Sequence, residues 1–293
     1  MRLSPRLLHS LIQLSLEEDH IDQDITTNSL FSTSIPAVAS IIAKEDLVLA
    51  GVSVAKRVFT EVDPQLKFTY KQKDGDVVSA GTTCCTISGD TRSLLRAERV
   101  ALNFLQHLSG IATLTHKFCK ATEGSKTKIL DTRKTTPGLR ALQKWAVTLG
   151  GGTNHRQSLK DGILIKDNHL ALLQSQGISI KEACHSAKKY ASRYIKVCIE
   201  TDTLAHVREA IKGKPDVILL DNMSPQQAKK AIHLVNGRTL IELSGGITLK
   251  NIRSYAHIGA DFISIGALTH SATAMDLSMD LAHLPRPISR SQK

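Results

Sequence analysis

The sequence predicts an α/β protein whose second part is a barrel, closed or incomplete, built from repeated strand–helix units. From about residue 111, short apolar runs alternate with helical patterns. The runs contain Val, Ile and Leu without polar alternation, which is typical of parallel strands buried on both faces. Six units exceed what a mononucleotide-binding half-fold needs, so a barrel is favoured over an open sheet. The runs are KILDT, ILIKD, IKVCIE, VILLD, TLIELSGG and FISIG.

The first part of the chain mixes helix and β structure. Residues 3–18 predict an amphipathic helix with one leucine face, formed by Leu3, Leu7, Leu11 and Leu14. The segment EEDHIDQDITT then predicts a turn. Strands are expected at AVASIIAK, LVLAG, LKFTYK, VVSAG and TTCCTIS, with a short helix around VSVAKRVFTEVD and a turn at residues 74–76.

A long helix is predicted from Thr91, with the sequence TRSLLRAERVALNFLQHLSG. Arg99 lies at the edge of its apolar face, and a face this broad requires a second domain or a second subunit to cover it. Ser109-Gly110 is the predicted domain boundary, which separates residues 1–110 from residues 111–275. Residues 276–293 are expected to be able to pack back on the first domain, and the final LPRPISRSQK to fray.

Composition narrows the class of ligand. The formal net charge is +11, which points to an acidic partner such as nucleic acid, a membrane surface or a polyanionic metabolite. Aromatic residues make up only 4% and no nucleic-acid motif is present, so an anionic small molecule is favoured over nucleic acid.

The N-terminus and the cysteines predict a cytoplasmic protein. His9 and Gln13 interrupt the first apolar stretch, acidic residues follow, and no small-residue cleavage site is present, so a signal peptide is not expected. No uninterrupted apolar run has the length of a membrane span. The five cysteines lack metal-ligand or CxxC spacing and predict buried thiols in a reducing compartment.

The segment from Lys128 to His169 concentrates positive charge where strands give way to loops. Such crowding is unfavourable unless an anion lies among the cations, so the segment predicts a pocket for a ligand with several phosphates or carboxylates. Its cations are Arg133, Lys134, Arg140, Lys144, His155, Arg156, Lys160 and Lys166.

Other strand ends supply carboxylates and glycines. Ligands of βα proteins bind at the carboxyl ends of the strands, where Glu200 and Asp221 are expected. Among cations, these acids suit ribose hydroxyls, positive charge developing at a sugar C1, or Mg²⁺ waters. The turns at Ser244-Gly245-Gly246 and Ile265-Gly266-Ala267 offer backbone N–H groups to a phosphate, the first backed by a helix over TLKNIRSYAHIG. Together these features describe phosphoribosyl diphosphate.

Each residue also has a simpler interpretation. Lys134 and Arg140 could pair with surface acids, and His155 could be an ordinary loop histidine. Glu200 could cap a helix or pair with Lys166. His169, at a strand end, could be structural or functional.

Several long motifs in the right order resemble the quinolinate phosphoribosyltransferase family. They are DTRKTTPGLR, the run from KWAV to GGGTNHR, LIKDNH, VCIE, LLDNM, ELSGGI, SIGALTH and ERVALNFLQHLSGIAT. The resemblance implies a pentosyltransferase also called nicotinate-nucleotide diphosphorylase (carboxylating). The implied reaction converts quinolinate and phosphoribosyl diphosphate, with Mg²⁺, into nicotinate mononucleotide, diphosphate and CO₂ in de novo NAD synthesis. It also implies an N-terminal α/β sandwich domain, a barrel-like second domain and a homodimer, or a higher oligomer, with active sites completed across the interface.

The resemblance further implies roles for individual residues. The two carboxylates of quinolinate would be held by Arg133, His155, Arg156 and Lys166, with Arg99 from the neighbouring subunit. The expected catalytic residues are Lys134, Glu200 and Asp221. Lys134 and Lys166 would meet the diphosphate, and Glu200 and Asp221 the ribose and Mg²⁺. The remaining substrate-binding residues are Thr132 and, at the 5′-phosphate, Ser244, Gly245, Gly246, Ile265, Gly266, Ala267 and His270.

One departure and three alternatives remain. Gln23 stands where the family has glycine before Asp24, which puts the geometry of that loop in question. A related phosphoribosyltransferase for another acidic base, a molybdenum-transport-associated relative and a non-catalytic binder of phosphate metabolites are the alternatives. The cation set that includes Arg99, Arg133 and Arg156 favours quinolinate.

Overall fold

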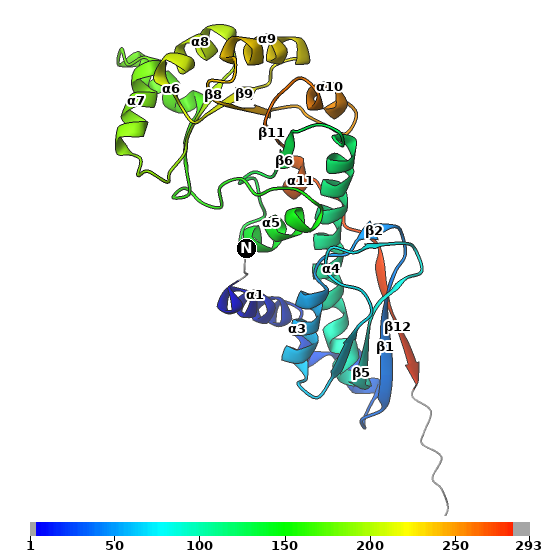
Figure 1. Ribbon diagram of the computed structural model, residues 1–293. Coiled ribbons are helices and arrows are strands. Elements are labelled where there is room, and N and C mark those ends of the chain that lie inside the picture. The colour runs from blue at the N-terminus through cyan, green and yellow to red at the C-terminus, as the bar shows by residue number, and fades with distance from the viewer. Residues whose placement is uncertain (1–3, 284–293) are drawn as a thin grey trace, which may run out of the picture. The chain divides into compact units, whose positions relative to one another are not determined.

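The computed structural model describes residues 4–283 and divides the chain into two compact units (Figure 1). The first contains the described residues up to Thr113 together with those from Ala272 onward, and the second is Leu114–Ser271. The predicted frayed end at residues 284–293, and Leu3 of the first helix, lie outside the described part of the chain. Within residues 4–283, none of the helices combines the length and the apolarity that a bilayer span requires.

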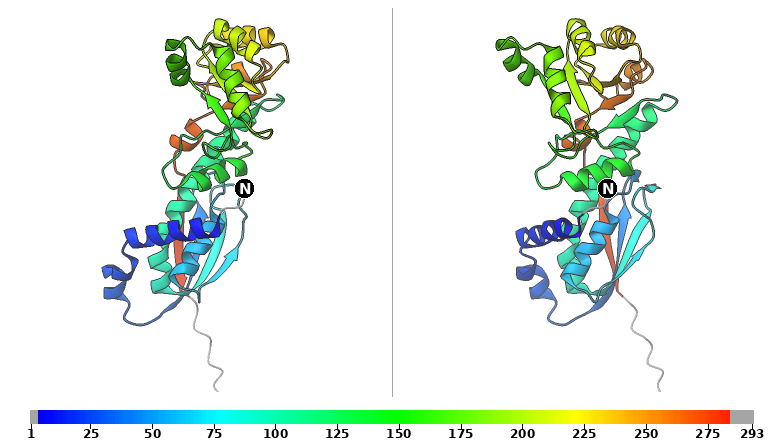
Figure 2. Two further views of the ribbon diagram at one scale, coloured as in Figure 1. Left: turned by 90° about the vertical axis from the view of Figure 1, so that its left-hand side faces the viewer. Right: turned by 60° about the vertical axis from the view of Figure 1, so that its left-hand side comes forward.

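The first unit is built around a four-stranded antiparallel sheet with the strand order β12-β1-β5-β3. The C-terminal strand β12 pairs with β1, and Ala43 lies opposite Leu277. Helices α3 and α4 lie beside this sheet (Figures 1 and 2). The unit comprises α1 (Pro5–Glu18), a 3-10 turn (Ile21–Gln23), α2 (Ile25–Leu30), β1 (Pro36–Ala43), β2 (Leu47–Val48), α3 (Val52–Val62), β3 (Lys67–Tyr70), β4 (Val77–Val78), β5 (Thr83–Asp90), the first part of α4 (Thr91–Ala121) and β12 (Leu277–His283).

The buried face of α1 differs from the prediction. Leu7 and Leu14 are exposed, whereas Ile12 and Leu16 are buried. A polar contact explains why the helix packs through a different face than predicted, because Gln13 Nε2 donates to Glu61 Oε2 of α3 at 3.0 Å. Leucines occur on several sides of this helix, so their spacing alone could not identify the face that packs on α3.

The segment predicted as a turn before β1 contains helix α2. The Asp24 carboxylate accepts a hydrogen bond from the Thr27 N–H at 2.9 Å and so caps α2. Gln23 closes a 3-10 turn through its N–H to the His20 carbonyl, and His20, not Gln23, has a positive φ of 46°. The backbone at position 23 therefore does not require glycine.

Helix α4 continues past Gly110, the last residue of the predicted helix, and ends at Ala121. The Ser109 hydroxyl accepts a hydrogen bond from the Ala50 N–H at 3.0 Å. A Cβ on Gly110 would lie 2.1 Å from the Thr273 carbonyl oxygen. The small residues are thus needed where other backbone segments approach the helix, and they do not end it.

The second unit confirms the predicted barrel and shows that it is open. Six strands, all parallel, follow the order β6-β11-β10-β9-β8-β7, so β6 and β7 lie at opposite edges. Helices α7 and α8 pack on the outside of β7 and β8 (Figure 2). The elements are β6 (Lys128–Leu130), α5 (Arg140–Leu149), β7 (Ile163–Ile165), α6 (Asp167–Ser175), α7 (Ile180–Tyr190), β8 (Val197–Thr201), α8 (Leu204–Gly213), β9 (Val217–Asp221), α9 (Pro225–Val235), β10 (Leu240–Ser244), α10 (Ile252–Ala256), β11 (Phe262–Ser264) and α11 (Ala267–His270).

Cys84, Cys85, Cys184 and Cys198 are buried free thiols, as predicted, and Cys119 is half-buried. Burial raises the pKa of Cys84 to about 11 and that of Cys184 to about 11. These two thiols stay protonated near neutral pH and behave as small apolar side chains.

Gly110→Ala is expected to lower the free energy of unfolding by about 2 kcal/mol, because the added methyl overpacks the contact with Thr273. Chemical denaturation would measure the change. Gly162→Ala is a matched control, since the one described atom within 4 Å of its Cβ would be the Lys196 carbonyl oxygen, at 3.7 Å. Equal stability of the two variants would contradict the tight approach at Gly110.

Candidate active site

The carboxyl ends of the six parallel strands surround a cavity of about 490 Å³. Successive side chains of a strand point to opposite faces, so residues two apart share the interior of the barrel. Leu219 therefore lies in an apolar floor, with Cys198, Val217, Leu164 and Leu240. Polar side chains two residues later along the strands line the wall. The lining residues are Thr132, Arg133, Lys134, His155, Arg156, Leu164, Lys166, Glu200, Leu219, Asp221, Asn222, Glu242, Ser244, Gly245, Gly246 and Ser264.

Most of the predicted site residues meet at this cavity. The expected catalytic residues Lys134, Glu200 and Asp221 all line it. So do these predicted binding residues: Thr132, Arg133, His155, Arg156, Lys166, Ser244, Gly245 and Gly246. Their roles stay predictions, but their positions converge.

The second predicted phosphate turn lies beside the cavity lining. Ile265 is buried and His270 is exposed, with its Nδ1 2.6 Å from Ser271 Oγ. A Cβ on Gly266 would lie 3.0 Å from both His270 Nε2 and Lys134 Cδ, so these residues are neighbours. Ala267 begins the short helix α11. Arg99 belongs to the first unit, on α4, where it is exposed, and its contribution to the site stays a prediction.

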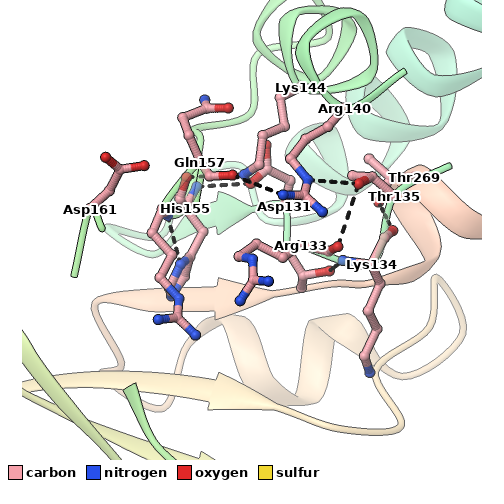
Figure 3. Close-up of polar contacts among 12 residues, drawn as sticks. Asp131, Arg133, Lys134, Thr135, Arg140, Lys144, His155, Gln157, Asp161 and Thr269 are labelled. Carbon is pink, nitrogen blue, oxygen red and sulfur yellow. Dashed lines mark hydrogen bonds and ion pairs between the residues drawn. The ribbon is translucent and has the colours of Figure 1, made fainter. Parts of the chain in front are cut away.

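Three of the predicted pocket cations do not line the cavity. Lys144 is fully buried in an ion pair with Asp131 (Figure 3). Arg140 donates to Thr135 Oγ1 at 2.9 Å and also to a main-chain carbonyl, and Lys160 is exposed. Lys144 lies on the side of α5 that faces Asp131, which the charge pattern alone could not reveal.

Positive and negative side chains occupy different parts of the cavity wall. Arg133 and Lys134 follow β6, Lys166 follows β7, and Arg156 lies in the loop between α5 and β7. The carboxylates of Glu200, Asp221 and Glu242 come from the middle strands β8, β9 and β10. An anion would be attracted to the edge-strand side, while the acidic side suits hydroxyl donors or a cation.

Arg133 provides a direct sign of an anion-binding role. Its Nε is buried and has no hydrogen-bond partner among the described residues. A buried unsatisfied donor is costly unless a ligand completes it. Burial and the like charge of Arg133 lower the pKa of the neighbouring Arg156 guanidinium. Both guanidinium groups would gain from a carboxylate placed between them.

Glu242 is a site residue that the sequence interpretation missed. Its side chain is almost completely buried on β10 and its Oε2 lies 3.4 Å from His155 Nε2. The Arg156 N–H donates to His155 Nδ1 at 2.7 Å, so Nδ1 is an acceptor and the ring proton belongs on Nε2, toward Glu242. The signal was available, because Glu242 precedes Ser244 by two residues and must share its face.

Asn222, which the sequence places at the end of the VILLD run without assigning it a role, also lines the cavity. It has a positive φ of 54°, and its side-chain amide donates to Asp221 Oδ2 at 2.6 Å. A Cβ on Gly245 would lie 2.2 Å from Asn222 Oδ1. The glycine turn therefore packs directly against the residue that orients Asp221.

The turn at Ser244-Gly245-Gly246 can bind a phosphate, but a helix N-terminus does not support it as predicted. Helix α10 covers only Ile252–Ala256 and begins well after the turn, where Asn251 Oδ1 instead accepts the Thr248 N–H at 2.7 Å. Gly245 and Gly246 both have positive φ, and neither N–H donates to another described residue. These N–H groups are the donors that remain for a ligand.

Contacts bear on the alternative interpretations of His169 and Glu200. His169 Nδ1 accepts the Lys166 N–H at 3.0 Å and so completes the cap of α6, which is a structural role. Glu200 forms no ion pair with Lys166 among the described residues. Burial raises the pKa of Glu200, and the Asp221 carboxylate raises it further. Two neighbouring acids held in this way favour a bound cation or a shared proton.

Glu200→Gln is expected to raise the Tm at about pH 7.5 and to change it little at about pH 4. Because folding raises the pKa of Glu200, the contribution of this carboxyl to stability falls as pH rises above the unfolded pKa of about 4.3. Below that value the carboxyl is protonated in both states. Calorimetry at the two pH values measures the difference, with Glu209→Gln as a control at a half-buried carboxylate that pairs with Lys212 and does not line the cavity. A Tm at the higher pH that does not exceed the wild-type value would contradict the assignment.

Comparison with known proteins agrees with this geometry. Residues 24–109 match the quinolinate phosphoribosyl transferase N-terminal domain, and residues 111–280 match the C-terminal domain of the same family. The chain is 40% identical to "Probable nicotinate-nucleotide pyrophosphorylase [carboxylating]" of Bacillus subtilis, over 94% of this chain and 93% of that protein. It is also 40% identical to the chloroplastic nicotinate-nucleotide pyrophosphorylase [carboxylating] of Arabidopsis thaliana, over 94% and 82% of the two chains.

Solved structures show the same fold. The crystal structure of NadC from Streptococcus pyogenes is similar with a TM-score of 0.91 and 42% identity, over 97% of this chain and 100% of that one. The nicotinate-nucleotide pyrophosphorylase of Francisella tularensis has a TM-score of 0.89 and 38% identity, over 96% and 98%. The motifs, the cavity and both domain matches agree, and the chain belongs to the quinolinate phosphoribosyl transferase family.

Proposed function

We propose that this chain transfers a phosphoribosyl group from 5-phosphoribosyl 1-diphosphate to quinolinate, with decarboxylation, in NAD biosynthesis. The products are nicotinate mononucleotide, diphosphate and CO₂. The observation that carries the proposal is the division of one cavity into a cationic side and an acidic side, with a glycine turn at its edge. An aromatic diacid suits the first, a ribose the second and a phosphate the third.

The quinolinate carboxylates are assigned to the cationic side. Arg133 and Arg156 offer planar guanidinium groups that can pair with a carboxylate through two hydrogen bonds, which lysine cannot do. The buried Nε of Arg133, which lacks a partner among the described residues, supports this assignment. Lys166 adds positive charge, and His155 can offer its Nε2–H to a carboxylate in competition with Glu242.

Phosphoribosyl diphosphate is assigned to the rest of the wall. Lys134 and Lys166 would neutralise the diphosphate, and Glu200 and Asp221 would accept hydrogen bonds from the ribose hydroxyls. The N–H groups of Gly245 and Gly246 support a 5′-phosphate at the glycine turn. The neighbouring residues Ile265, Gly266, Ala267 and His270 would complete that phosphate site.

Mg²⁺ is expected to enter with the diphosphate. Within residues 4–283, no cluster of three or more His, Cys, Asp or Glu side chains could hold a metal ion by itself. Glu200 and Asp221 nevertheless fit a hydrated divalent ion, because both carboxylates line the cavity and the Asp221 carboxylate helps to raise the pKa of Glu200. When bound, the ion would neutralise charge on the leaving diphosphate.

The residues of the cavity act by positioning and electrostatics. Arg133, Arg156 and Lys166 would place the pyridine nitrogen opposite C1 of the ribose. The bond from C1 to the diphosphate oxygen breaks as the nitrogen attacks, and the carboxylates of Glu200 and Asp221 stabilise the positive charge that develops on the sugar. The C2 carboxyl group then leaves as CO₂, its bonding electrons remain on C2 beside the cationic nitrogen, and C2 takes up a proton.

The dimer belongs to the same proposal. Arg99 is exposed on α4 and lies in the other unit of the chain, so we assign it to the cationic side of a partner subunit's cavity. Arginine at this place would add one more bidentate contact to a quinolinate carboxylate. Arg99→Ala would then raise the KM for quinolinate while leaving the fold intact.

The direct test is a product assay with quinolinate carrying a labelled C2 carboxylate. With phosphoribosyl diphosphate and Mg²⁺, the purified chain is expected to release label in equal amount to the nicotinate mononucleotide formed. Nicotinate is the matched control substrate, because it has no C2 carboxylate to lose. Binding of both substrates without product would favour a non-catalytic binder, and turnover of nicotinate alone would favour a different phosphoribosyltransferase.

Mixed dimers test the shared site. Arg99→Ala and Lys134→Ala subunits, assayed at a quinolinate concentration at which each has little activity alone, are expected to regain roughly a quarter of wild-type activity when mixed equally. Half of the random dimers then combine the two subunits, and each of these has one intact site. Activity that stays at the level of the separate variants would contradict a site built from two chains.

A further inference from the structure

A buried ion pair lies next to the cavity and does not line it. Asp131 follows β6 and Lys144 lies in the middle of α5, and both side chains are completely buried (Figure 3). Neither is among the residues that line the cavity. An ion pair in such a place needs a reason, because apolar residues of similar volume often serve stability equally well.

The pair holds the main chain of the loop that carries two cavity residues. The Lys144 ammonium donates to Asp131 Oδ1 and, at 3.0 Å, to the His155 carbonyl oxygen. The His155 N–H donates to the same Asp131 Oδ1 at 2.8 Å. Both main-chain polar groups of His155 are therefore fixed by the pair.

Asn154 adds a third connection to the same carboxylate. The Asn154 amide is assigned the orientation in which its nitrogen faces two acceptors. In that orientation the nitrogen donates to Asp131 Oδ2 at 2.5 Å and to the Lys144 carbonyl oxygen at 2.8 Å. Asp131 thus receives hydrogen bonds on both oxygens, which is the arrangement that a buried carboxylate requires.

The fixed main chain determines the orientation of the side chains at the cavity. The Arg156 N–H donates to His155 Nδ1 at 2.7 Å, so the ring presents Nε2 to the cavity. The Arg156 guanidinium is held through its donation to the Gly162 carbonyl oxygen at 2.9 Å. A small shift at residues 154–155 would move the imidazole and the guanidinium together.

We propose that Asp131 and Lys144 are positioning residues that align His155 and Arg156 for the aromatic diacid. This inference rests on the proposed function for the identity of the ligand. The alignment serves only one side of the cavity, because Glu200, Asp221 and Ser244 are placed by the paired strands β8, β9 and β10. Loss of the pair should therefore weaken quinolinate binding and leave phosphoribosyl diphosphate binding nearly unchanged.

The test compares two variants with a control. Asp131→Asn/Lys144→Met removes both charges together, so that neither is left buried without a partner. Asn154→Ala is a milder change that keeps the ion pair and removes only the amide contact. Thr127→Val is the control, because it removes buried hydrogen bonds to Ala256 and Ala260 at the opposite end of β6.

The double variant is expected to raise the KM and Kd for quinolinate by about tenfold, and Asn154→Ala by about threefold, with the Kd for phosphoribosyl diphosphate within about twofold of wild type. Thr127→Val should lower the Tm without changing either Kd. If the double variant does not fold, Asn154→Ala decides. A wild-type Kd for quinolinate in the folded variants, or an equal rise for both substrates, would overturn the proposal.

Histidine spectroscopy separates this inference from the proposed function. In ¹⁵N spectra of the wild-type chain without substrates, the His155 ring, assigned by difference from His155→Gln, is expected as the Nε2–H tautomer. The double variant should show a mixture of tautomers. An unchanged tautomer in that variant would contradict the positioning role, even if the product assay shows that the wild-type chain releases CO₂. A wild-type chain that releases no CO₂ but shows the expected spectra would instead reject only the proposed activity.

Discussion

The parallel register of the six strands in the second unit is the constraint on which the site depends. Ser244 pairs with Asp221 in that register, and Glu200 pairs with Leu219, so polar side chains from different strands reach the same end of the barrel interior. Apolar residues two positions earlier in the strands form the floor of the cavity. A shift of one residue in a single strand would turn its polar group outward and remove it from the cavity.

The fold and most of the cavity could be predicted because both follow from simple periodicities. Uninterrupted apolar runs identified the parallel strands, and the last residue of each run identified the wall of the cavity. Glu242 was not predicted because it lies in the middle of β10 and not at its end, although its spacing of two residues from Ser244 places both on the same face. The cap at Asp24 was missed because a single hydrogen bond converts an apparent turn into a helix.

Other errors arose because only tertiary contacts decide them. Lys134 and Lys144 belong to the same cation-rich segment, yet one lines the cavity and the other is buried with Asp131. Gly110 looks like a helix stop, but its lack of a side chain makes room for the backbone at Thr273. In both cases the residue type indicates that the position is special. The sequence does not indicate which other residue it contacts.

The open edge of the barrel has a mechanical consequence. Among the described residues, strand β7 pairs only with β8, and β6 pairs with β11 and forms one isolated bridge to Thr153. Three of the positive side chains of the cavity follow these two strands, Arg133 and Lys134 after β6 and Lys166 after β7. The side chains placed to meet an anion thus follow the two edge strands of the sheet, so the distance between them is set by fewer backbone hydrogen bonds than the distances among the middle strands.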